Sequence, residues 1–304
     1  MGDSTGFLRI PNIERLADFD VAWPVDRRLL SAGMTGVLRV RNEQQNLPWS
    51  LPGLLRACDR VVLVDNQSDD DTVGAAWRVA AAAGLADRLE VVAYPHAVSR
   101  CGADHLATNP RSVHSLAHFY NWAFSKVRTT YSLKWDGDMV LTPEGIRLVA
   151  DLSWQLQGVE AVVRMHRHPL YVESERVGYL DTGTWDNEEY AYPMGTRWLH
   201  HKAFDWELRL SPQSTPTMGL PQGICLEIKH LAGDEFGHWT EPGRFRAQRN
   251  RRKAREWEVF HALCAGVVPE GVVRVESPDT RHVVEFVAEE WLPAVPRPIA
   301  RPPG

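Results

Sequence analysis

The sequence predicts an α/β fold in which helices flank a mostly parallel sheet. Between residues 35 and 156, short β-branched or apolar segments alternate with segments of helical periodicity, which is the pattern of strand–helix–strand units. One short segment, Arg60–Asp65 (RVVLVD), is a nearly continuous apolar run, as expected for a central parallel strand that is covered on both faces. From about residue 158 onward the pattern is less regular.

The regular half divides into four strands and four helices. The expected strands are short and rich in apolar residues: Gly36–Arg41, Arg60–Asp65, Leu89–Tyr94 and Tyr131–Trp135. Each expected helix starts at residues suited to cap it: Asn42 before Glu43–Ala57, Ser68–Asp71 before a helix to about Ala83, Asn109-Pro110 before a helix through Val127, and Thr142-Pro143. This order predicts a parallel sheet with helices on both faces.

The second half gives fewer signals. Residues 159–167 and 225–231 have strand character, and the stretch between them is rich in Trp, Tyr, Pro and Gly. A strongly basic helix is expected over Arg244–Glu258, and the Pro-rich tail from residue 293 to 304 is expected to be extended or disordered.

Composition restricts the class of protein. Hydrophobic residues make up 44% of the 304 residues, which is enough for a substantial core. The net charge of −5 argues against a general nucleic-acid binder, which is usually basic. The four cysteines form no Cys-x-x-Cys pair, so neither a zinc site nor a disulfide framework is expected. Without an apolar leader or an apolar run of membrane-spanning length, we expect a cytoplasmic protein with no transmembrane segment.

Three polar clusters follow predicted strands: Arg41–Glu43, Asp65–Ser68 and Asp136–Asp138. Ligands of open α/β sheets bind beside the carboxyl ends of the strands, so one site is expected to gather all three clusters. Asp65 can accept a hydrogen bond from a base N–H, such as the imide of uracil, or it can cap the next helix. Arg41 can meet a phosphate or pair with a surface acid.

The Asp136-Gly137-Asp138 cluster is the strongest candidate for a metal site. Two carboxylates separated by one glycine can both turn toward one cation, and hard oxygen ligands suit Mn²⁺ or Mg²⁺. Such an ion neutralises charge on a departing diphosphate. The alternative is a simple turn, which Asp-Gly favours. Similar pairs at Asp18/Asp20 and Asp69/Asp71 do not directly follow a predicted strand.

Three segments together resemble a known family. The runs LRVRNE, RVVLVDNQSDDDT and YSLKWDGDM, with Asn121 on the helix before the last strand, are similar to family 2-type glycosyltransferases of the GT-A fold. The resemblance covers residues 35–156. It implies a nucleoside-diphosphate sugar donor of UDP or GDP type and a hydroxyl acceptor. Two departures are Tyr120, where many members carry an arginine, and the segment 97–109, which has the character of an insertion.

The resemblance also assigns roles to residues. Nucleotide binding falls to the strand ends: Val40, Arg41, Asn42, Glu43, Asp65, Asp136 and Gly137. The metal falls to Asp136 and Asp138, with His230 as a candidate third ligand and His238 in reserve. The expected organisation is an extension over 1–34, a nucleotide-sugar-binding half over 35–156, an acceptor-binding half over 157–292 and a tail over 293–304.

The general base is expected late in the chain. Many inverting members carry an acidic residue about 90–100 positions after the Asp-x-Asp motif, which takes the acceptor hydroxyl proton. Asp234 and Glu235 lie at 234 − 138 = 96 and 235 − 138 = 97, so we expect an inverting reaction. The alternative is a surface acidic pair, and the rival acids are Asp186, Glu188 and Glu189.

Some alternatives stay open at this point. The basic run Arg244–Arg255 fits a lid over the diphosphate, a peripheral contact with a membrane's inner face or with nucleic acid, or a solvated helix face. A nucleotidyltransferase also combines such a sheet with metal-binding acids, but the loop after the first strand lacks the usual glycines. A non-catalytic carbohydrate- or nucleic-acid-binding module would leave the acids at three strand ends without a purpose.

Overall fold

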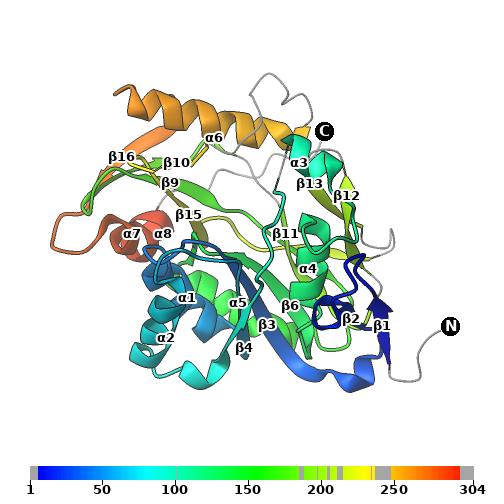
Figure 1. The fold of residues 1–304 in the computed structure, drawn as a ribbon. Coiled ribbons are helices and arrows are strands. Elements are labelled where there is room, and N and C mark those ends of the chain that lie inside the picture. The colour runs from blue at the N-terminus through cyan, green and yellow to red at the C-terminus, as the bar shows by residue number, and fades with distance from the viewer. Residues whose placement is uncertain are drawn as a thin grey trace.

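The chain folds around two sheets that meet at the Asp-Gly-Asp motif (Figure 1). The computed structural model describes residues 6–100, 102–184, 188–196, 198–203, 206–210, 215–233, 235–236 and 248–294. Among these residues no helix is long and apolar enough to cross a membrane.

The larger sheet has seven strands, and four of its six pairings are parallel. Its order is β14 (Thr217–Gly219), β8 (Val162–Met165), β11 (Glu188–Pro193), β6 (Thr129–Asp136), β3 (Ser31–Val40), β4 (Arg60–Asp65) and β5 (Leu89–Ala93). The predicted fold class, a mixed α/β fold with a mostly parallel sheet flanked by helices, is confirmed.

Helices cover both faces of this sheet (Figure 1). One face packs against α1 (Leu47–Ala57), α2 (Thr72–Ala82) and α5 (Pro143–Gln155). The other face packs against α4 (Leu116–Phe124) and the hairpin β1 (Phe7–Ile10)–β2 (Val21–Pro24). Along β4 the buried side chains alternate between these two cores, because successive residues of a strand point to opposite faces.

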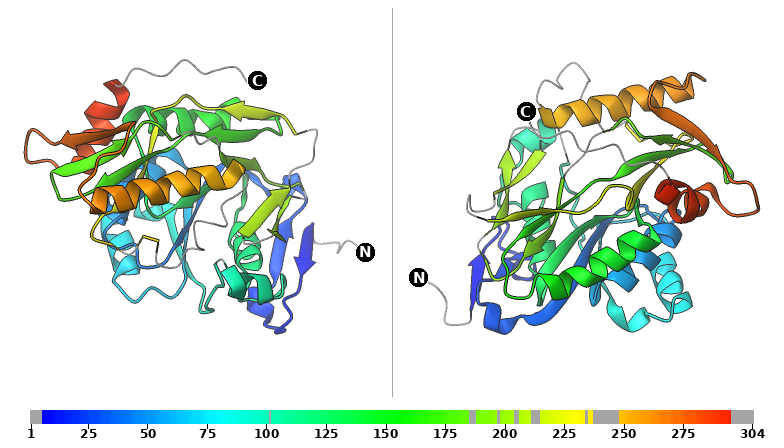
Figure 2. Two further views of the ribbon diagram at one scale, coloured as in Figure 1. Left: turned by 90° about the horizontal axis from the view of Figure 1, so that it is seen from above. Right: turned by 180° about the vertical axis from the view of Figure 1, so that it is seen from behind.

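The smaller sheet has five strands in the order β16 (Val272–Glu276), β10 (Val177–Asp181), β9 (His168–Val172), β15 (Cys225–His230) and β7 (Met139–Leu141). One face packs on α6 (Gln248–Cys264), and the other packs on the helical segment formed by α7 (Val283–Phe286), a π-turn (Val287–Trp291) and α8 (Leu292–Ala294) (Figure 2). Because β6 ends at Asp136 and β7 begins at Met139, the chain crosses from one sheet to the other at the Asp-Gly-Asp motif.

Shorter elements complete the chain. They are the helix α3 (Gly102–Ala107), the hairpin β12 (Leu199–Ala203)–β13 (Trp206–Leu210), and 3₁₀ turns at Ala17–Phe19, Arg27–Leu29 and Ala86–Arg88.

Two predicted helix starts are wrong. Asn42 does not cap α1; its φ of 59° is left-handed, and its amide oxygen accepts from the Asp69 backbone N–H at 2.7 Å. α1 therefore begins later, at Leu47 after Asn46. Asn109 accepts from the Arg111 N–H at 2.9 Å in a local turn, and α4 starts only at Leu116. The Asn42 side chain thus bonds to the loop after β4 and the Asn109 side chain closes a local turn, so neither caps a helix.

Other boundaries agree with the sequence. β4 has the predicted limits, and Thr142 caps α5 by accepting from the Gly145 N–H at 3.1 Å. The basic helix is present as α6 from Gln248, while residues 244–247 lie outside the described part of the chain.

Candidate functional site

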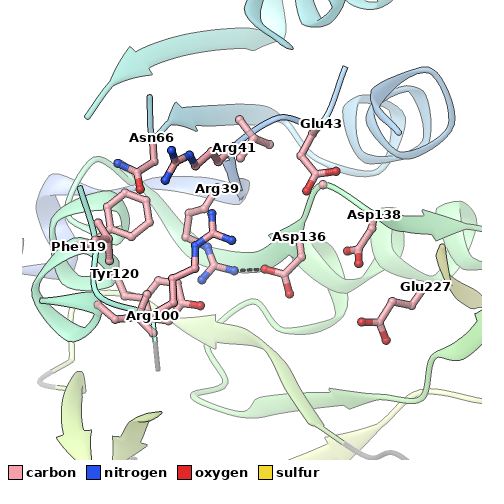
Figure 3. A pocket seen from close by; sticks show the side chains of 14 residues that line it. Arg39, Arg41, Glu43, Asn66, Arg100, Phe119, Tyr120, Asp136, Asp138 and Glu227 are labelled. Carbon is pink, nitrogen blue, oxygen red and sulfur yellow. Dashed lines mark hydrogen bonds and ion pairs between the residues drawn. The ribbon is translucent and has the colours of Figure 1, made fainter. Parts of the chain in front are cut away.

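A cavity of about 270 Å³ opens at the carboxyl ends of β3, β4 and β6. It is lined by Arg39, Val40, Arg41, Glu43, Asn66, Val98, Arg100, Leu116, Phe119, Tyr120, Asp136, Gly137, Asp138 and Glu227 (Figure 3). Six predicted site residues are among them: Val40, Arg41, Glu43, Asp136, Gly137 and Asp138. The edge of the parallel sheet therefore gathers side chains from six separate segments of the chain.

Asp136 lies at the end of β6 and forms an ion pair with Arg39 of the neighbouring strand β3. The Arg39 guanidinium also stacks over the Tyr120 ring, 4.0 Å from its centroid. Burial raises the pKa of Asp136, but the positive charges of Arg39, Lys134 and Arg167 outweigh it and hold this pKa below its ordinary value. Asp136 is thus an anion at neutral pH.

Asp138 is in the opposite electrostatic situation. Burial, followed by the charges of Glu227 and Glu43, raises its pKa well above the ordinary value, and the attraction of Lys229 does not offset this. Its position is fixed by the backbone, because its carbonyl accepts from the Ile228 N–H of β15 at 2.8 Å. An additional positive charge beside Asp138 would relieve the repulsion among these acids.

Gly137 lets Glu43 approach the motif. A Cβ at this position would lie 2.5 Å from Cγ of Glu43, so a side chain there would displace Glu43. Burial raises the pKa of Glu43 to about 7, assisted by the charges of Glu235 and Asp136 and opposed by a 2.8 Å hydrogen bond from Asn46 and by Arg100. The glycine of the motif thus serves close packing of an acid.

The acids fit a hard divalent cation by their chemistry. Carboxylates of Glu43, Asp136, Asp138 and Glu227 lie along one side of the cavity (Figure 3), and Mn²⁺ and Mg²⁺ prefer such oxygen ligands. Burial, assisted by the negative charge of neighbouring acids, raises the pKa of two of these acids, Glu43 and Asp138. In the part of the chain that the structure describes, no three His, Cys, Asp or Glu side chains are grouped closely enough to form a metal site.

Asp65 lies next to the cavity instead of lining it. One carboxylate oxygen, Oδ1, is buried and accepts no hydrogen bond from the described residues, while Oδ2 is 3.5 Å from the Ser68 backbone nitrogen. Its neighbour Asn66 lines the cavity, held by hydrogen bonds from its amide to the carbonyls of Tyr94 and His96. A buried acceptor without a partner is costly, so this oxygen is suited to a ligand N–H.

The remaining strand-end residues are engaged locally. Arg41 is 3.8 Å from Asp69, and the Asn42 backbone N–H donates to the Ser68 hydroxyl at 2.9 Å. Both contacts tie the loop after β3 to the loop after β4.

His230 and Glu235 lie on the acidic side of the site. The backbone N–H of His230 donates to Glu235 Oε1 at 2.9 Å, and its Nε2 is 2.8 Å from Oδ1 of Asn46. Asn46 in turn donates to Glu43, so the imidazole reaches the cavity acids through one amide. Asp234 lies outside the described residues.

The rival acids are less available. Glu188 pairs with Lys134 at 2.9 Å, and Glu189 forms an ion pair with Arg209. Asp186 and His238 lie outside the described residues.

The basic run is not a solvated helix face along its described part. Arg252 contacts Glu256 at 3.1 Å with only 12% of its side chain exposed, and Arg255 contacts Asp181 at 2.8 Å. These contacts hold α6 against the five-stranded sheet. That hypothesis is wrong for Arg252 and Arg255, while Arg251 is exposed.

Sequence reasoning missed three charged residues that line the cavity: Arg39, Arg100 and Glu227. An arginine within an otherwise apolar strand was a usable signal for Arg39, as was Glu227 within the strand CLEIKH. Arg100 gave no signal, because the inserted segment that carries it has no strand or long helix to predict its direction.

Comparisons with known proteins give matches among solved structures. No family model and no curated protein matches the chain. S. aureus TarS 1-349 in complex with UDP-GlcNAc is 12% identical, with a TM-score of 0.41, over 76% of this chain and 72% of that one. Glucosyl-3-phosphoglycerate synthase from Mycobacterium tuberculosis, in complex with Mn²⁺, UDP and glucosyl-3-phosphoglycerate, is 11% identical, with a TM-score of 0.33, over 86% and 92%.

A second structure of S. aureus TarS 1-349 is 18% identical, with a TM-score of 0.31, over 45% of this chain; the match spans only 36% of that protein. The comparison thus returns glycosyltransferases, the class of protein that the sequence resembles. At these identities and TM-scores the similarity carries nothing about donor, acceptor or metal.

Proposed function

We propose that this chain is a glycosyltransferase that moves a sugar from a nucleoside-diphosphate donor of UDP or GDP type to a hydroxyl acceptor, with the help of Mn²⁺ or Mg²⁺. The observation that carries the proposal is the cavity at the carboxyl edge of the parallel sheet, where Asp136 and Asp138 face arginines across one space. A negatively charged diphosphate together with its cation is the kind of ligand that such mixed charges suit.

The residues in and beside the cavity would have separate roles in binding the cation and the base. Asp136 and Asp138, with Glu43 and Glu227 beside them, would hold the cation, which when bound neutralises charge developing on the departing diphosphate. Asp65 offers its buried oxygen to an N–H of the base. Fixed positive and negative groups need no rearrangement as the sugar bond breaks, and this lowers the barrier.

Glu235 is our candidate for the general base of an inverting reaction, with Asp234 as its neighbour in the same loop. Its Oε1 accepts from the His230 backbone N–H, and its charge acts on Glu43, so it lies near the cavity acids. A carboxylate there takes the acceptor hydroxyl proton as the new bond forms at the anomeric carbon.

Donor hydrolysis tests the function. UDP- and GDP-hexoses are incubated with the protein and Mn²⁺, with and without EDTA, and the released nucleoside diphosphate is measured. We expect release only with the cation, and a ligand at a hundred times its Kd should stabilise the fold by about 2.7 kcal/mol. The proposal would be contradicted if no donor gave either nucleoside diphosphate release or a thermal shift. Full activity in EDTA would contradict the part of the proposal that assigns a metal.

The base is tested by Glu235→Gln against Asp234→Asn. One variant should lose about 10²–10⁴-fold in rate while keeping donor affinity, because the base does not hold the diphosphate. NMR of the anomeric proton of the product reports the stereochemistry. A product that retains the donor's anomeric configuration, or near wild-type rates for both variants, would contradict this assignment.

A further inference from the structure

We propose that the donor's diphosphate is bound by two arginines, Arg39 and Arg100, so that a nucleoside diphosphate binds this site even without a divalent cation. The identity of the ligand rests on the proposed function. The arginines themselves are assigned from the charge distribution in the cavity, from the contacts that hold Arg39 and from the segment that carries Arg100.

The cavity is electrically divided. Figure 3 shows Arg39, Arg41 and Arg100 on one side, and the acids that include Asp136 and Asp138 on the other. A cation placed among the acids and a dianion placed among the arginines would lie next to each other. The arginine side can therefore attract phosphates on its own.

Arg39 supplies a fixed guanidinium at the centre of this arrangement. It is only 8% exposed, pairs with Asp136, and lies over the Tyr120 ring. Tyr120 of α4 occupies the position where the resemblance predicts an arginine. The positive charge beside it comes instead from Arg39 of β3, whose guanidinium stacks on the Tyr120 ring. Ion pairing and stacking fix the planar group, which is the form that matches a phosphate in two hydrogen bonds.

Arg100 supplies a second guanidinium from the segment between β5 and α3. It is exposed, lines the cavity, and makes no hydrogen bond or ion pair with the described residues; its charge acts on Glu43. An exposed cation that lines the cavity on the same side as the Arg39 guanidinium is suited to bind an anion together with it.

The segment that carries Arg100 is held in place. The Ser99 N–H donates to the His114 carbonyl at 2.9 Å, and the Thr108 hydroxyl donates to Ser99 Oγ at 3.0 Å. Lys202 donates to the Thr108 carbonyl at 2.6 Å. These hydrogen bonds hold Ser99 and Thr108 in place, and Val98 and Arg100 on either side of Ser99 line the cavity.

Binding of UDP, GDP and inorganic pyrophosphate to the full chain in EDTA tests the proposal by calorimetric titration. We expect binding of pyrophosphate and of at least one nucleotide in EDTA. Arg100→Gln should weaken both by about 10- to 100-fold, the loss of a charge-assisted hydrogen bond. Arg111→Gln is the matched control, because Arg111 is an exposed arginine shortly after this segment and does not line the cavity.

Arg39→Lys keeps the charge and removes the planar fork, and it should also weaken pyrophosphate binding while the melting temperature shows whether it folds. Absence of binding in EDTA, or equal affinities for Arg100→Gln and Arg111→Gln, overturns the inference. Donor hydrolysis with Mn²⁺ would still support the proposed function in that case. Conversely, Arg100-dependent pyrophosphate binding without sugar transfer supports the inference and contradicts the function.

Discussion

Strand β4 of the seven-stranded sheet and strand β15 of the five-stranded sheet carry their charged residues at different positions. In the seven-stranded sheet, β4 is apolar from Val61 to Val64 and becomes acidic only at its last residue, Asp65, next to the cavity. In the five-stranded sheet, β15 carries Glu227 and Lys229 within the strand, and both are buried. Asp65 lies beside the cavity, whereas Glu227 and Lys229 form ion pairs with other protein groups.

Helix α6 explains most of the second pattern. Glu256 of this helix is fully buried and contacts Arg252 at 3.1 Å, Lys253 at 3.2 Å and Lys229 at 3.8 Å. Glu227 joins the same group, since it contacts Lys229 at 3.1 Å and also lines the cavity. The paired charges around Glu256 hold α6 against the sheet. The cavity acids lack such balance, which lowers the stability of the fold and favours a bound ligand. Four substitutions test this contrast.

Asp138→Asn should have the largest effect. We expect transfer to fall roughly 10³-fold or more, since losing a metal contact raises the barrier by several kcal/mol. Stability at neutral pH should stay equal or rise, because burial and the charges of Glu227 and Glu43 make ionised Asp138 unfavourable. Product release and melting temperature measure the two effects. A marked fall in melting temperature would show that Asp138 is a structural acid.

Glu256→Gln should destabilise the fold by about 3–5 kcal/mol, because it leaves buried cations without their acid. The matched control is Glu258→Gln on the exposed side of the same helix, which should change stability little. Urea denaturation of both variants gives the comparison. Similar values for the two would mean that the buried charges do not hold α6.

Asp65→Asn should weaken binding of the nucleotide by about 1 kcal/mol, roughly fivefold, with little change in melting temperature. The amide keeps the size of the carboxylate but cannot offer two acceptors. Titration with UDP and with inorganic pyrophosphate separates base from phosphate binding, and only UDP should be affected. Equal losses for both ligands would place Asp65 elsewhere in the site.

The smallest expected effect is on pH dependence. The pKa of Glu43 is raised from 4.5 to about 7, so the folded state holds a proton that the unfolded state loses first. Its contribution to stability is complete below 4.5 and is lost as pH rises through 7. Glu43→Gln should remove this slope from the unfolding free energy. Parallel pH curves for wild type and variant would contradict the assignment.

The sequence by itself determined the features that are local. β4 has its predicted limits because a continuous apolar run is bounded by charged residues, and Thr142 caps α5 as its type and the following proline require. The Asp-Gly-Asp motif was recognisable because it directly follows a strand. At Asn109 a local turn competes with a helix cap, and at Asn42 a contact with the distant loop after β4 does so, and the sequence predicted a helix start at both.

Only the tertiary structure decided which charges face each other. Arg39 meets Asp136 across 97 positions of sequence, since β3 and β6 are neighbours in the sheet. Glu227 comes beside Asp138 because β15 pairs with β7, the strand that follows the motif. Such pairings depend on strand order and register, and no local pattern encodes them. For this reason the sequence predicted Glu43, Asp136 and Asp138, and the fold added Arg39 and Glu227 beside them.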